Sequence, residues 1–237
     1  MTPPPFAGMH SLREGYRALV IGASGALGQA FVQALERDPR CGEVQAVSRG
    51  QPCDWDLTDA ASLTAMAAQL PGPWHLVVDA TGALTVDGHG PEKRLQELDA
   101  ERLLHSLQIN AVGPALLVQQ FSPQLARGER VIWAKLSARV GSIEDNRKGG
   151  WYGYRAAKAA LNQLLQTAAI ELARQRPLAV VAALQPGTVR SALSQPFVGD
   201  DALDPALSAQ RLLAVLDALA PSGRAQFVDH LGQHIPW

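Results

Sequence analysis

Tyr154 and Lys158 stand four positions apart in the helix-like stretch WYGYRAAKAALN. Residues i and i+4 lie side by side on a helix, so the phenol and the ammonium group should be neighbours. A nearby ammonium group favours phenolate and lowers the pKa of a tyrosine. Such a phenol could exchange a proton with a carbonyl or alcohol oxygen near neutral pH. Tyr152 has Ala156 four residues on, lacks this partner, and should pack or line a wall.

The run GASGALG, from Gly22 to Gly28, follows the first apolar strand-like segment and could bind phosphate. Gly22 permits a tight turn, Gly25 or Ala26 lets the backbone approach a phosphate, and Gly28 lets a helix pack closely on the strand. The first N–H groups of that helix could then bind a pyrophosphate. Tight turns also use glycine for packing alone, but the position after the first strand favours a dinucleotide.

Arg49 ends the second strand-like segment, where no acidic residue is present to bind ribose hydroxyls. A basic residue here accommodates a 2′-phosphate, which favours NADP(H), with NAD(H) as the other candidate cofactor. A solvated surface arginine is the alternative. Asp56, in DWDLTD, could reach an adenine amino group or cap a helix, and Thr58 or Asp59 could also provide that cap.

Short β-branched runs alternate with segments of helical periodicity, and these must position the candidate residues. The helical segments run from Leu27 to Asp38, from about Pro91 to Ala126 with Pro114 as a kink or division, and from Tyr152 to about Gln175. The pattern predicts an α/β fold, a single-domain Rossmann-type doubly wound parallel sheet with helices on both faces. Ligands bind beyond the carboxyl ends of such strands, where these motifs occur. The strand-like runs are residues 18–22, 43–48, 75–80, 130–136, 178–184 and 225–229.

The bulk composition restricts the class of protein. A chain of 237 residues with net charge -1 suits one α/β domain and gives no basic surface for nucleic acid. We expect a proline-containing flexible arm over residues 1–17 and one domain over 18–237. No apolar run approaches the ~18 residues that span a bilayer. Cys41 and Cys53 form no disulfide or metal pattern, so we expect a cytoplasmic protein with no metal. From the charge and the short apolar runs we expect no membrane or nucleic-acid partner.

The motifs GASGALG, DLTD, QINAVGP with Asn110, YRAAK and QPGTVRS occur in that order over about residues 18–192. In this the chain resembles the short-chain dehydrogenase/reductase family. The segment LSARVGSIEDNRKGGWYGYRAAKAALN, PEKRL at 91–95 and the ending IPW are similar to its C-factor (C-signal) and sniffer-like carbonyl reductase branch. The resemblance implies NAD(P)(H)-dependent reduction of a small carbonyl compound by a homodimer or homotetramer. The alternative is a C-factor-like, cofactor-binding signalling or regulatory protein with weak or no turnover.

The resemblance also implies a role for each matching residue. Tyr154 would protonate the carbonyl as hydride arrives, Lys158 would bond the nicotinamide ribose, and Asn110 would hold a water that relays protons to Lys158. The implied cofactor contacts are Gly22, Ser24, Ala26, Leu27 and Gly28 at the phosphates and ribose, Asp56 and Leu57 at the adenine, Pro186, Gly187 and Val189 at the carboxamide, and Ser191 near the pyrophosphate.

The chain departs from the family pattern at the serine that orients the substrate carbonyl. Family members usually carry two serines after the fifth strand, and here the pair is Ser137-Ala138, with Ala138 in the catalytic slot. Ser137 would point to the other face unless a bulge redirects it. Ser142 could swing in as a substitute, or neither serine acts.

A second departure follows the strand at 75–80, where the family commonly has Asn-Asn-Ala-Gly. Here Asp79 is followed by Ala80, Thr81 and Gly82, which should still form the adenosine-side wall of the cofactor site. Asp79 is a candidate structural substitute for the asparagine that ties the sheet to its neighbour. Residues from about 193 to 205, with Phe197 and Val198, should form a lid.

Overall fold

All six strand-like runs form strands of one parallel sheet in the computed structural model, which describes residues 6–51, 53–191 and 202–237. The strand order is β2-β1-β3-β4-β5-β6. This sheet, with its flanking helices, confirms the predicted fold class. The strands are β1 (Tyr16–Ile21), β2 (Cys41–Val47), β3 (Leu76–Asp79), β4 (Val131–Leu136), β5 (Ala179–Gln185) and β6 (Ala225–Asp229).

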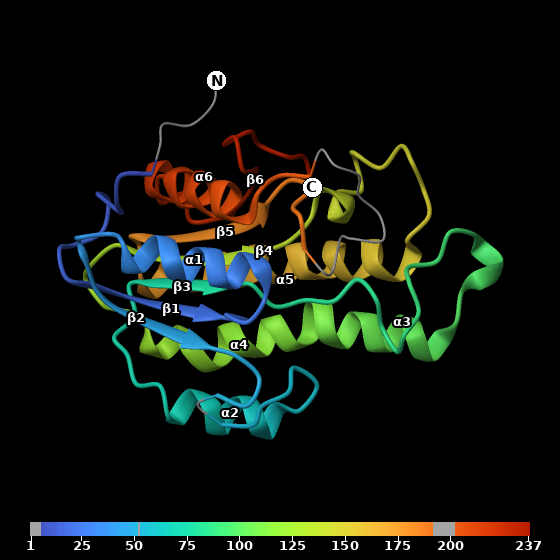
Figure 1. Cartoon of the computed structure of the whole chain (residues 1–237), viewed down its shortest axis with the longest axis horizontal. Helices are drawn as coiled ribbons and strands as arrows, with labels where there is room; N and C mark the ends of the chain where they lie inside the picture. The colour runs from blue at the N-terminus through green and yellow to red at the C-terminus, as the bar shows by residue number, and fades with distance from the viewer. Residues whose placement is uncertain (1–5, 52, 192–201) are drawn as a thin grey trace.

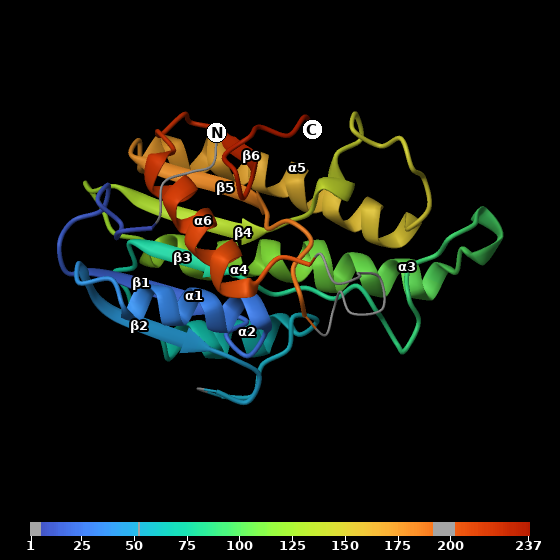
Figure 2. The same ribbon diagram turned by 45° about the horizontal axis from the view of Figure 1, so that its top comes forward.

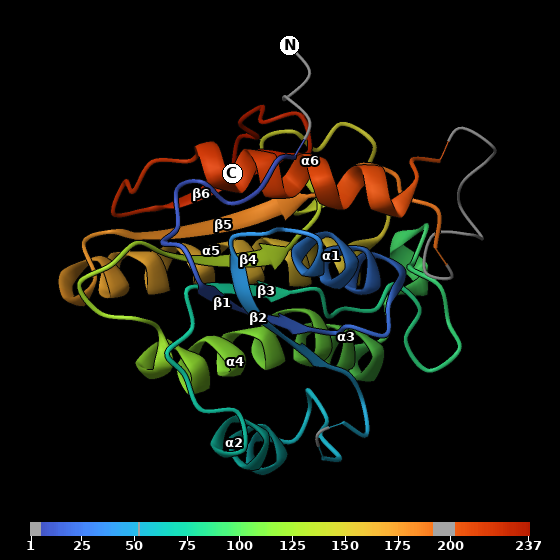
Figure 3. The same ribbon diagram turned by 60° about the vertical axis from the view of Figure 1, so that its left-hand side comes forward.

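Helices cover both faces of the sheet because successive strand residues point to opposite sides. On β4, Ile132 and Ala134 join one apolar core, whereas Val131 and Trp133 join the other. Figure 1 and Figure 3 show the sheet between these two layers. The first core packs under α1 (Ala26–Glu36) and α6 (Pro205–Ala218), and the second under α2 (Ala60–Ala68), α4 (Gly113–Phe121) and α5 (Tyr152–Gln175).

The chain changes its direction of progress across the sheet at β1, whose neighbours are β2 and β3. Connections on either side of such a switch point diverge, which leaves room for a ligand beyond the carboxyl ends of the strands. Figure 2 shows the segments after β3 and β4 extending beyond one edge of the sheet, next to the start of α5.

The packed domain begins before residue 18, within the segment expected to be a flexible arm. Met9 and Leu12 are buried, and β1 already begins at Tyr16. The Met9 N–H donates to Asp38 Oδ2 at 2.8 Å, which ties this segment to the end of α1. Residues 6–17 therefore include packed parts of the domain, and residues 1–5 lie outside the described ranges.

The helical segment expected over 91–126 is divided into several elements. After a short 3-10 turn, η1 (Leu95–Glu97), the α-helix α3 (Ala100–Leu107) begins at an Asp99 cap. A π-helical turn, η2 (Gln108–Val112), joins α3 to α4, and the division thus lies just before Pro114. Turns of this kind often occur at functional sites, and this one carries Asn110. Two more 3-10 turns are η3 (Ser122–Gln124) and η4 (Arg139–Gly141).

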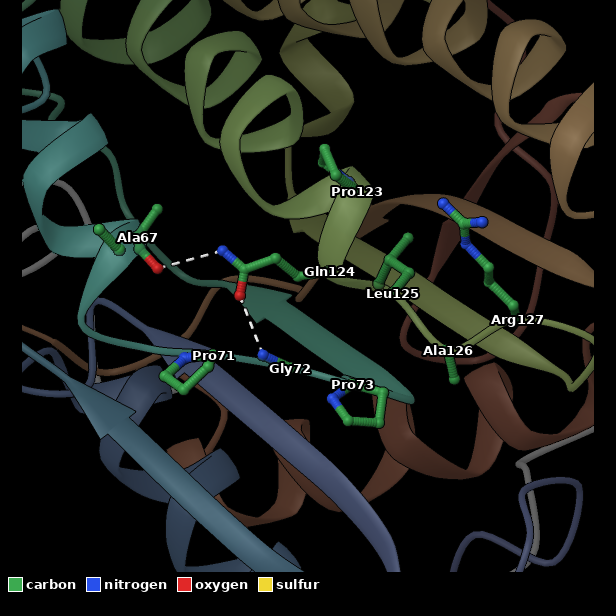
Figure 4. Close-up of a pocket in the computed structure, with 10 residues that line it drawn as sticks. Ala67, Pro71, Gly72, Pro73, Pro123, Gln124, Leu125, Ala126 and Arg127 are labelled. Atoms are coloured by element: carbon green, nitrogen blue, oxygen red, sulfur yellow. Dashed lines mark hydrogen bonds between the residues drawn. The ribbon is translucent and has the colours of Figure 1, made fainter.

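Gln124 fastens the amino edge of the sheet, opposite the carboxyl ends of the strands. Its Nε2 donates to Ala67 O at 3.1 Å, and its Oε1 accepts from the Gly72 N–H at 3.0 Å. Figure 4 shows both bonds beside a hollow of about 450 Å³. Apart from Gln124, whose amide is engaged at both ends, Arg127 is the only other lining residue with a polar side chain. This hollow therefore offers no acid–base chemistry. No described helix is both long enough and apolar enough to cross a membrane.

We expect Gln124→Leu to lower the free energy of unfolding by about 1–2 kcal/mol, because the Gly72 N–H and the Ala67 carbonyl lose a partner. Urea denaturation followed by circular dichroism measures the change. Gln69→Leu is the control, because Gln69 is an exposed glutamine at the end of α2 and should stay within ~0.5 kcal/mol of wild type. Equal stability of the two variants would contradict this fastening role.

Candidate active site

A cavity of about 860 Å³ lies beyond the carboxyl ends of β1, β3, β4 and β5. Motifs that are far apart in the sequence meet in its walls. Of the residues predicted for the site, those that line it are Gly25, Ala26, Leu27, Gly28, Ala80, Thr81, Gly82, Ser137, Tyr154, Lys158, Pro186, Gly187, Val189 and Ser191. Gly22, Ser24, Arg49, Asp56, Leu57, Asn110 and Ser142 are not among the lining residues.

The glycine turn leaves no room for side chains at two positions. Gly22 has φ 86°, a left-handed conformation that glycine adopts without strain. A Cβ on Gly28 would lie 2.1 Å from Gly22 O, so only glycine lets α1 approach the end of β1 this closely. No side chain caps the N-terminus of α1 at Gly25. The first backbone N–H groups of α1, which begins in the cavity wall, therefore have no side-chain acceptor.

The start of α5, which carries Tyr154, is held by Glu92. Glu92 O accepts from the Trp151 N–H, and its buried carboxylate accepts from the Gly153 N–H at 3.0 Å. A carboxylate at a helix N-terminus is stabilising. Trp151 itself has φ 55°, and its ring packs edge-on against Tyr154 with 6.2 Å between centroids. These contacts fix the first turn of α5 and the direction of the Tyr154 ring.

Lys158 and Tyr154 are neighbours, as their spacing predicts. The Lys158 Nζ lies 5.6 Å from the centroid of the Tyr154 ring. It donates to Leu136 O, at the end of β4, at a distance of 3.1 Å. Lys158 is buried, so its amine is held between α5 and the sheet.

The expectation that Lys158 lowers the pKa of Tyr154 is wrong for this structure. Burial raises the pKa of Tyr154 to about 12. Burial, with a further contribution from the charge of Lys135, lowers the pKa of Lys158 to about 7. Both groups lose hydration, and an amine that is only partly charged at neutral pH stabilises a phenolate weakly. The phenol therefore stays protonated at neutral pH and can act as a proton donor.

Asn110 is fully buried on the π-helical turn and grips the segment after β3. Its Nδ2 donates to Ala83 O at 2.8 Å, and its Oδ1 accepts from the Ala83 N–H at 3.0 Å. A Cβ on Gly82 would lie 3.1 Å from Asn110 Oδ1 and 3.6 Å from Lys158 Nζ. Asn110 and Lys158 therefore both approach Gly82 closely.

Both candidate serines are engaged in internal hydrogen bonds. The Ser137 hydroxyl donates to Asn162 Oδ1 at 2.7 Å. The Ser142 hydroxyl donates to Trp237 O at 3.4 Å and accepts from the Asp145 N–H at 3.0 Å. Ser137 and Ala138 both contribute to the cavity wall, whereas Ser142 does not. The role of either serine stays a prediction.

The residues expected near the adenosine lie on the surface after β2. Arg49 is exposed, and Asp56 Oδ1 accepts from Thr58 Oγ1 at 2.6 Å and from the Thr58 N–H at 2.7 Å. The Thr58 hydrogen bonds, with a smaller contribution from Arg49, lower the pKa of Asp56. Asp59, not Asp56, caps α2. Leu57 packs against Gly113, where a Cβ would lie 2.6 Å from Leu57 O.

The ion pair of Lys135 with Asp79 was not predicted from the sequence. Lys135 Nζ lies 2.9 Å from Asp79 Oδ1, and the two residues are paired in register on β4 and β3. Both side chains are buried. Asp79 thus joins β3 to β4 within the sheet, and its partner is a lysine that gave no spacing signal in the sequence.

Several cavity residues come from loops that have no periodicity to reveal them. Arg155 secures one such loop, because its guanidinium donates to Gly150 O at 2.9 Å and to Gly149 O at 3.2 Å. In the sequence, the Gly-Gly pair before Trp151 indicated a turn at this loop, because glycine readily adopts positive φ. In the structure Gly149, Gly150 and Trp151 all have positive φ. The lining residues not predicted for the site are Leu84, Leu136, Arg139, Val140, Lys148, Gly149, Trp151, Arg155, Gln185 and Thr188.

Two other expectations concern a lid and a metal. Most of the expected lid, including Phe197 and Val198, lies outside the described residues. Within the described ranges, no three histidine, cysteine or acidic side chains come together in a way that could hold a metal ion.

Comparisons with known proteins bear on the family and the fold of the chain. The family model described as enoyl-(acyl carrier protein) reductase matches residues 13–221. The C-signal protein of Myxococcus xanthus is 34% identical over 144 residues, which cover 60% of this chain and 83% of that protein. The carbonyl reductase Sniffer of D. melanogaster has a TM-score of 0.81 at 21% identity, over 95% of this chain and 100% of that chain. The NADPH-bound carbonyl reductase from chicken fatty liver has a TM-score of 0.81 at 23% identity, over 98% of each chain.

We expect Gly28→Ala to lower the melting temperature by several degrees, because its Cβ would lie 2.1 Å from the backbone oxygen of Gly22 and the turn must move. Gly25→Ala is the matched control, since its Cβ would make an ordinary contact at 3.5 Å. Differential scanning calorimetry of both variants checks the difference. A Gly28 variant as stable as the Gly25 variant would show that the turn yields without cost.

Proposed function

Because the chain belongs to the short-chain dehydrogenase/reductase family of oxidoreductases, we propose that it reduces a small carbonyl compound with NADPH, Tyr154 being the general acid. The observation that carries the proposal is the single cavity in which the glycine turn meets Tyr154 and Lys158. A dinucleotide could lie along this cavity with its phosphates at the turn and its nicotinamide near the phenol.

The residues of the cavity fit such a cofactor. The turn at Gly22 and Gly28 excludes side chains, which leaves backbone N–H groups for a pyrophosphate. Pro186, Gly187, Val189 and Ser191 line the wall after β5, where the carboxamide and pyrophosphate would bind. When bound, a nicotinamide dinucleotide supplies the hydride, and the protein orients it. The chicken liver carbonyl reductase, which has the same fold, binds NADPH.

Tyr154 is suited to donate rather than to remove a proton. Its pKa of about 12 keeps the phenol protonated at neutral pH, and its place in the cavity wall leaves it accessible to a substrate oxygen. Lys158 is suited to return a proton to this site, because a pKa of about 7 lets its Nζ gain or lose one near neutral pH. Asn110 would keep the segment after β3 in place beside Lys158.

A second candidate function is that of a cofactor-binding signalling or regulatory protein with weak or no turnover. It is favoured by Ala138 at the position of the family's catalytic serine and by the internal hydrogen bonds of Ser137 and Ser142. The similarity to C-signal points the same way.

The proposed assembly is a homodimer or homotetramer. Exposed apolar side chains lie on the neighbouring helices α3 and α5 and on η2, which joins α3 to α4: Leu104 is 65% exposed, Val112 47% and Leu164 40%. Burying such side chains between copies would be favourable. The proposed cellular location remains the cytoplasm.

We expect Tyr154→Phe to reduce NADPH-dependent turnover at least ~100-fold, because it removes the proton donor. The measurement follows NADPH absorbance with a panel of aldehydes, ketones and quinones, and calorimetry should show little change in NADPH affinity. Tyr152→Phe is the matched control, since Tyr152 is not among the lining residues, and it should retain activity.

Two outcomes of this experiment would change the assignment. Equal rates for wild type and Tyr154→Phe would remove Tyr154 from the mechanism. Tight NADPH binding by wild type with no turnover on the whole panel would favour the signalling alternative.

We expect Arg49→Ser to weaken NADPH binding by about tenfold while leaving NADH binding unchanged, because the guanidinium would face only the 2′-phosphate. Isothermal titration calorimetry with both cofactors gives the ratio of dissociation constants. Arg37→Ser provides the control, since it removes an exposed arginine at the far end of α1. A ratio unchanged in Arg49→Ser would leave Arg49 as a solvated surface residue.

A further inference from the structure

Lys135 and Asp79 form an ion pair in which both side chains are buried. Lys135 Nζ donates to Asp79 Oδ1 at 2.9 Å, Thr81 O at 2.6 Å and Thr81 Oγ1 at 3.0 Å, so all three ammonium protons have acceptors. Replacing a buried ion pair with apolar residues is often neutral or stabilising. Stability alone therefore does not explain why charges occupy these positions.

Asp79 has an unused oxygen in this buried environment. Its Oδ1 accepts from Thr81 Oγ1 at 2.6 Å and from the Thr81 N–H at 2.9 Å in addition to Lys135. Its Oδ2 is buried and has no hydrogen-bond partner among the described residues. The carboxylate is therefore only partly satisfied, and its remaining charge acts on the surrounding groups.

The pair lies beside Lys158. Asp79 and Lys135 alternate in phase with Val77 and Trp133, which belong to the core under α5, so both face the helix that carries Lys158. Lys158 Nζ donates to Leu136 O, next to Lys135 in the chain, and Lys135 Nζ donates to Thr81 O. The residue after Thr81 is Gly82, where a Cβ would lie 3.6 Å from Lys158 Nζ.

We propose that Lys135 and Asp79 are a positioning pair for Lys158, holding the ends of β3 and β4 around its amine and setting the electric field at that amine. The effect of the pair on catalysis rests on the proposed function, whereas its effect on the charge of the Lys158 amine does not. After burial, the charge of Lys135 is the larger influence that lowers the pKa of Lys158, and Asp79 opposes it. The pair thus helps to keep the amine near half-charged at neutral pH.

Other charged groups on the elements around Lys158 are engaged elsewhere. Arg139, on η4, pairs with Asp229 on β6 at 3.3 Å and with Asp145 at 3.6 Å. His105 and Arg102, on α3, pair with Asp87 and Asp99. Elements α4, β5 and η2 carry no titratable side chain. On α5 itself, Tyr152, Tyr154 and Arg155 lie within two turns of Lys158, and the Arg155 guanidinium donates to the carbonyls of Gly149 and Gly150, whereas Glu171 and Arg174 lie more than three turns farther on. The other groups to consider are Glu101, at the exposed start of α3, and the pair of Lys135 and Asp79.

The test measures the titration of Lys158 directly in the cofactor-free protein. The chain has four lysines, Lys93, Lys135, Lys148 and Lys158, so selective ¹³C labelling of lysine side chains gives a simple NMR spectrum, and Lys158→Met assigns the signal. We compare wild type with Lys135→Met and with the double variant Asp79→Asn/Lys135→Met. Lys93→Met is the control for removing an exposed lysine.

We expect the midpoint of the Lys158 titration to rise by about one pH unit in Lys135→Met, because Asp79 then acts alone. The double variant should fall between Lys135→Met and wild type, since it loses the larger lowering influence and the smaller raising one. Lys93→Met should match wild type. If Lys135→Met fails to fold with its unpaired carboxylate, the double variant, which leaves no charge at positions 79 and 135, decides.

A wild-type midpoint in the folded double variant would overturn the proposal. The pH profile of kcat, measured on any carbonyl substrate that wild type reduces, should move in the same order as the NMR midpoints. A purely structural pair would lower activity without moving this profile. Absence of turnover in wild type would refute the proposed function, while the NMR titration would still decide on the pair.

Discussion

Burial of ionisable groups at the carboxyl ends of β3 and β4 is the constraint on which the candidate site depends. Lys158, Lys135 and Asp79 are buried between α5 and the sheet, and Tyr154, on the first turn of α5, is half-buried beside the cavity. Burial raises the pKa of the phenol and lowers the pKa values of both amines. The same desolvation makes every remaining charge act strongly on its neighbours. Protonation at this site is therefore determined by packing as much as by the pairing of residues.

The packing that buries these groups comes partly from loops held by a few polar contacts. Glu92 caps the start of α5, Arg155 secures the loop after β4, and Asn110 grips the segment after β3. Each uses side-chain groups to satisfy backbone atoms that would otherwise lack partners in irregular structure. The contacts of Glu92 and Asn110 connect segments distant in sequence, and those of Arg155 hold a local loop. Together they shape cavity walls that helices and strands alone would not form.

The architecture could be predicted from the sequence because it depends on local periodicity. Each strand-like run forms a strand, and the helix from Tyr152 to Gln175 has the expected bounds. The family resemblance is likewise confirmed by the match over residues 13–221. The direction of the Tyr154 pKa shift was not predictable, because spacing reveals that Lys158 is near but not how deeply both groups are buried. Lys135 was missed for a related reason, since its partner Asp79 lies 56 positions away in the chain and meets it only through strand pairing.

Because of the π-helical turn at Gln108–Val112, the orientation of α3 relative to α4 depends on the number of residues between them. Such a turn holds one residue more than an α-helical turn. If the chain between Ser106 and Pro114 were one residue shorter, an ordinary α-helix would form and α3 would rotate by about 100° about its axis relative to α4. The face of α3 that now packs on α5 would then turn away from it. The number of residues in this segment is thus constrained separately from their types.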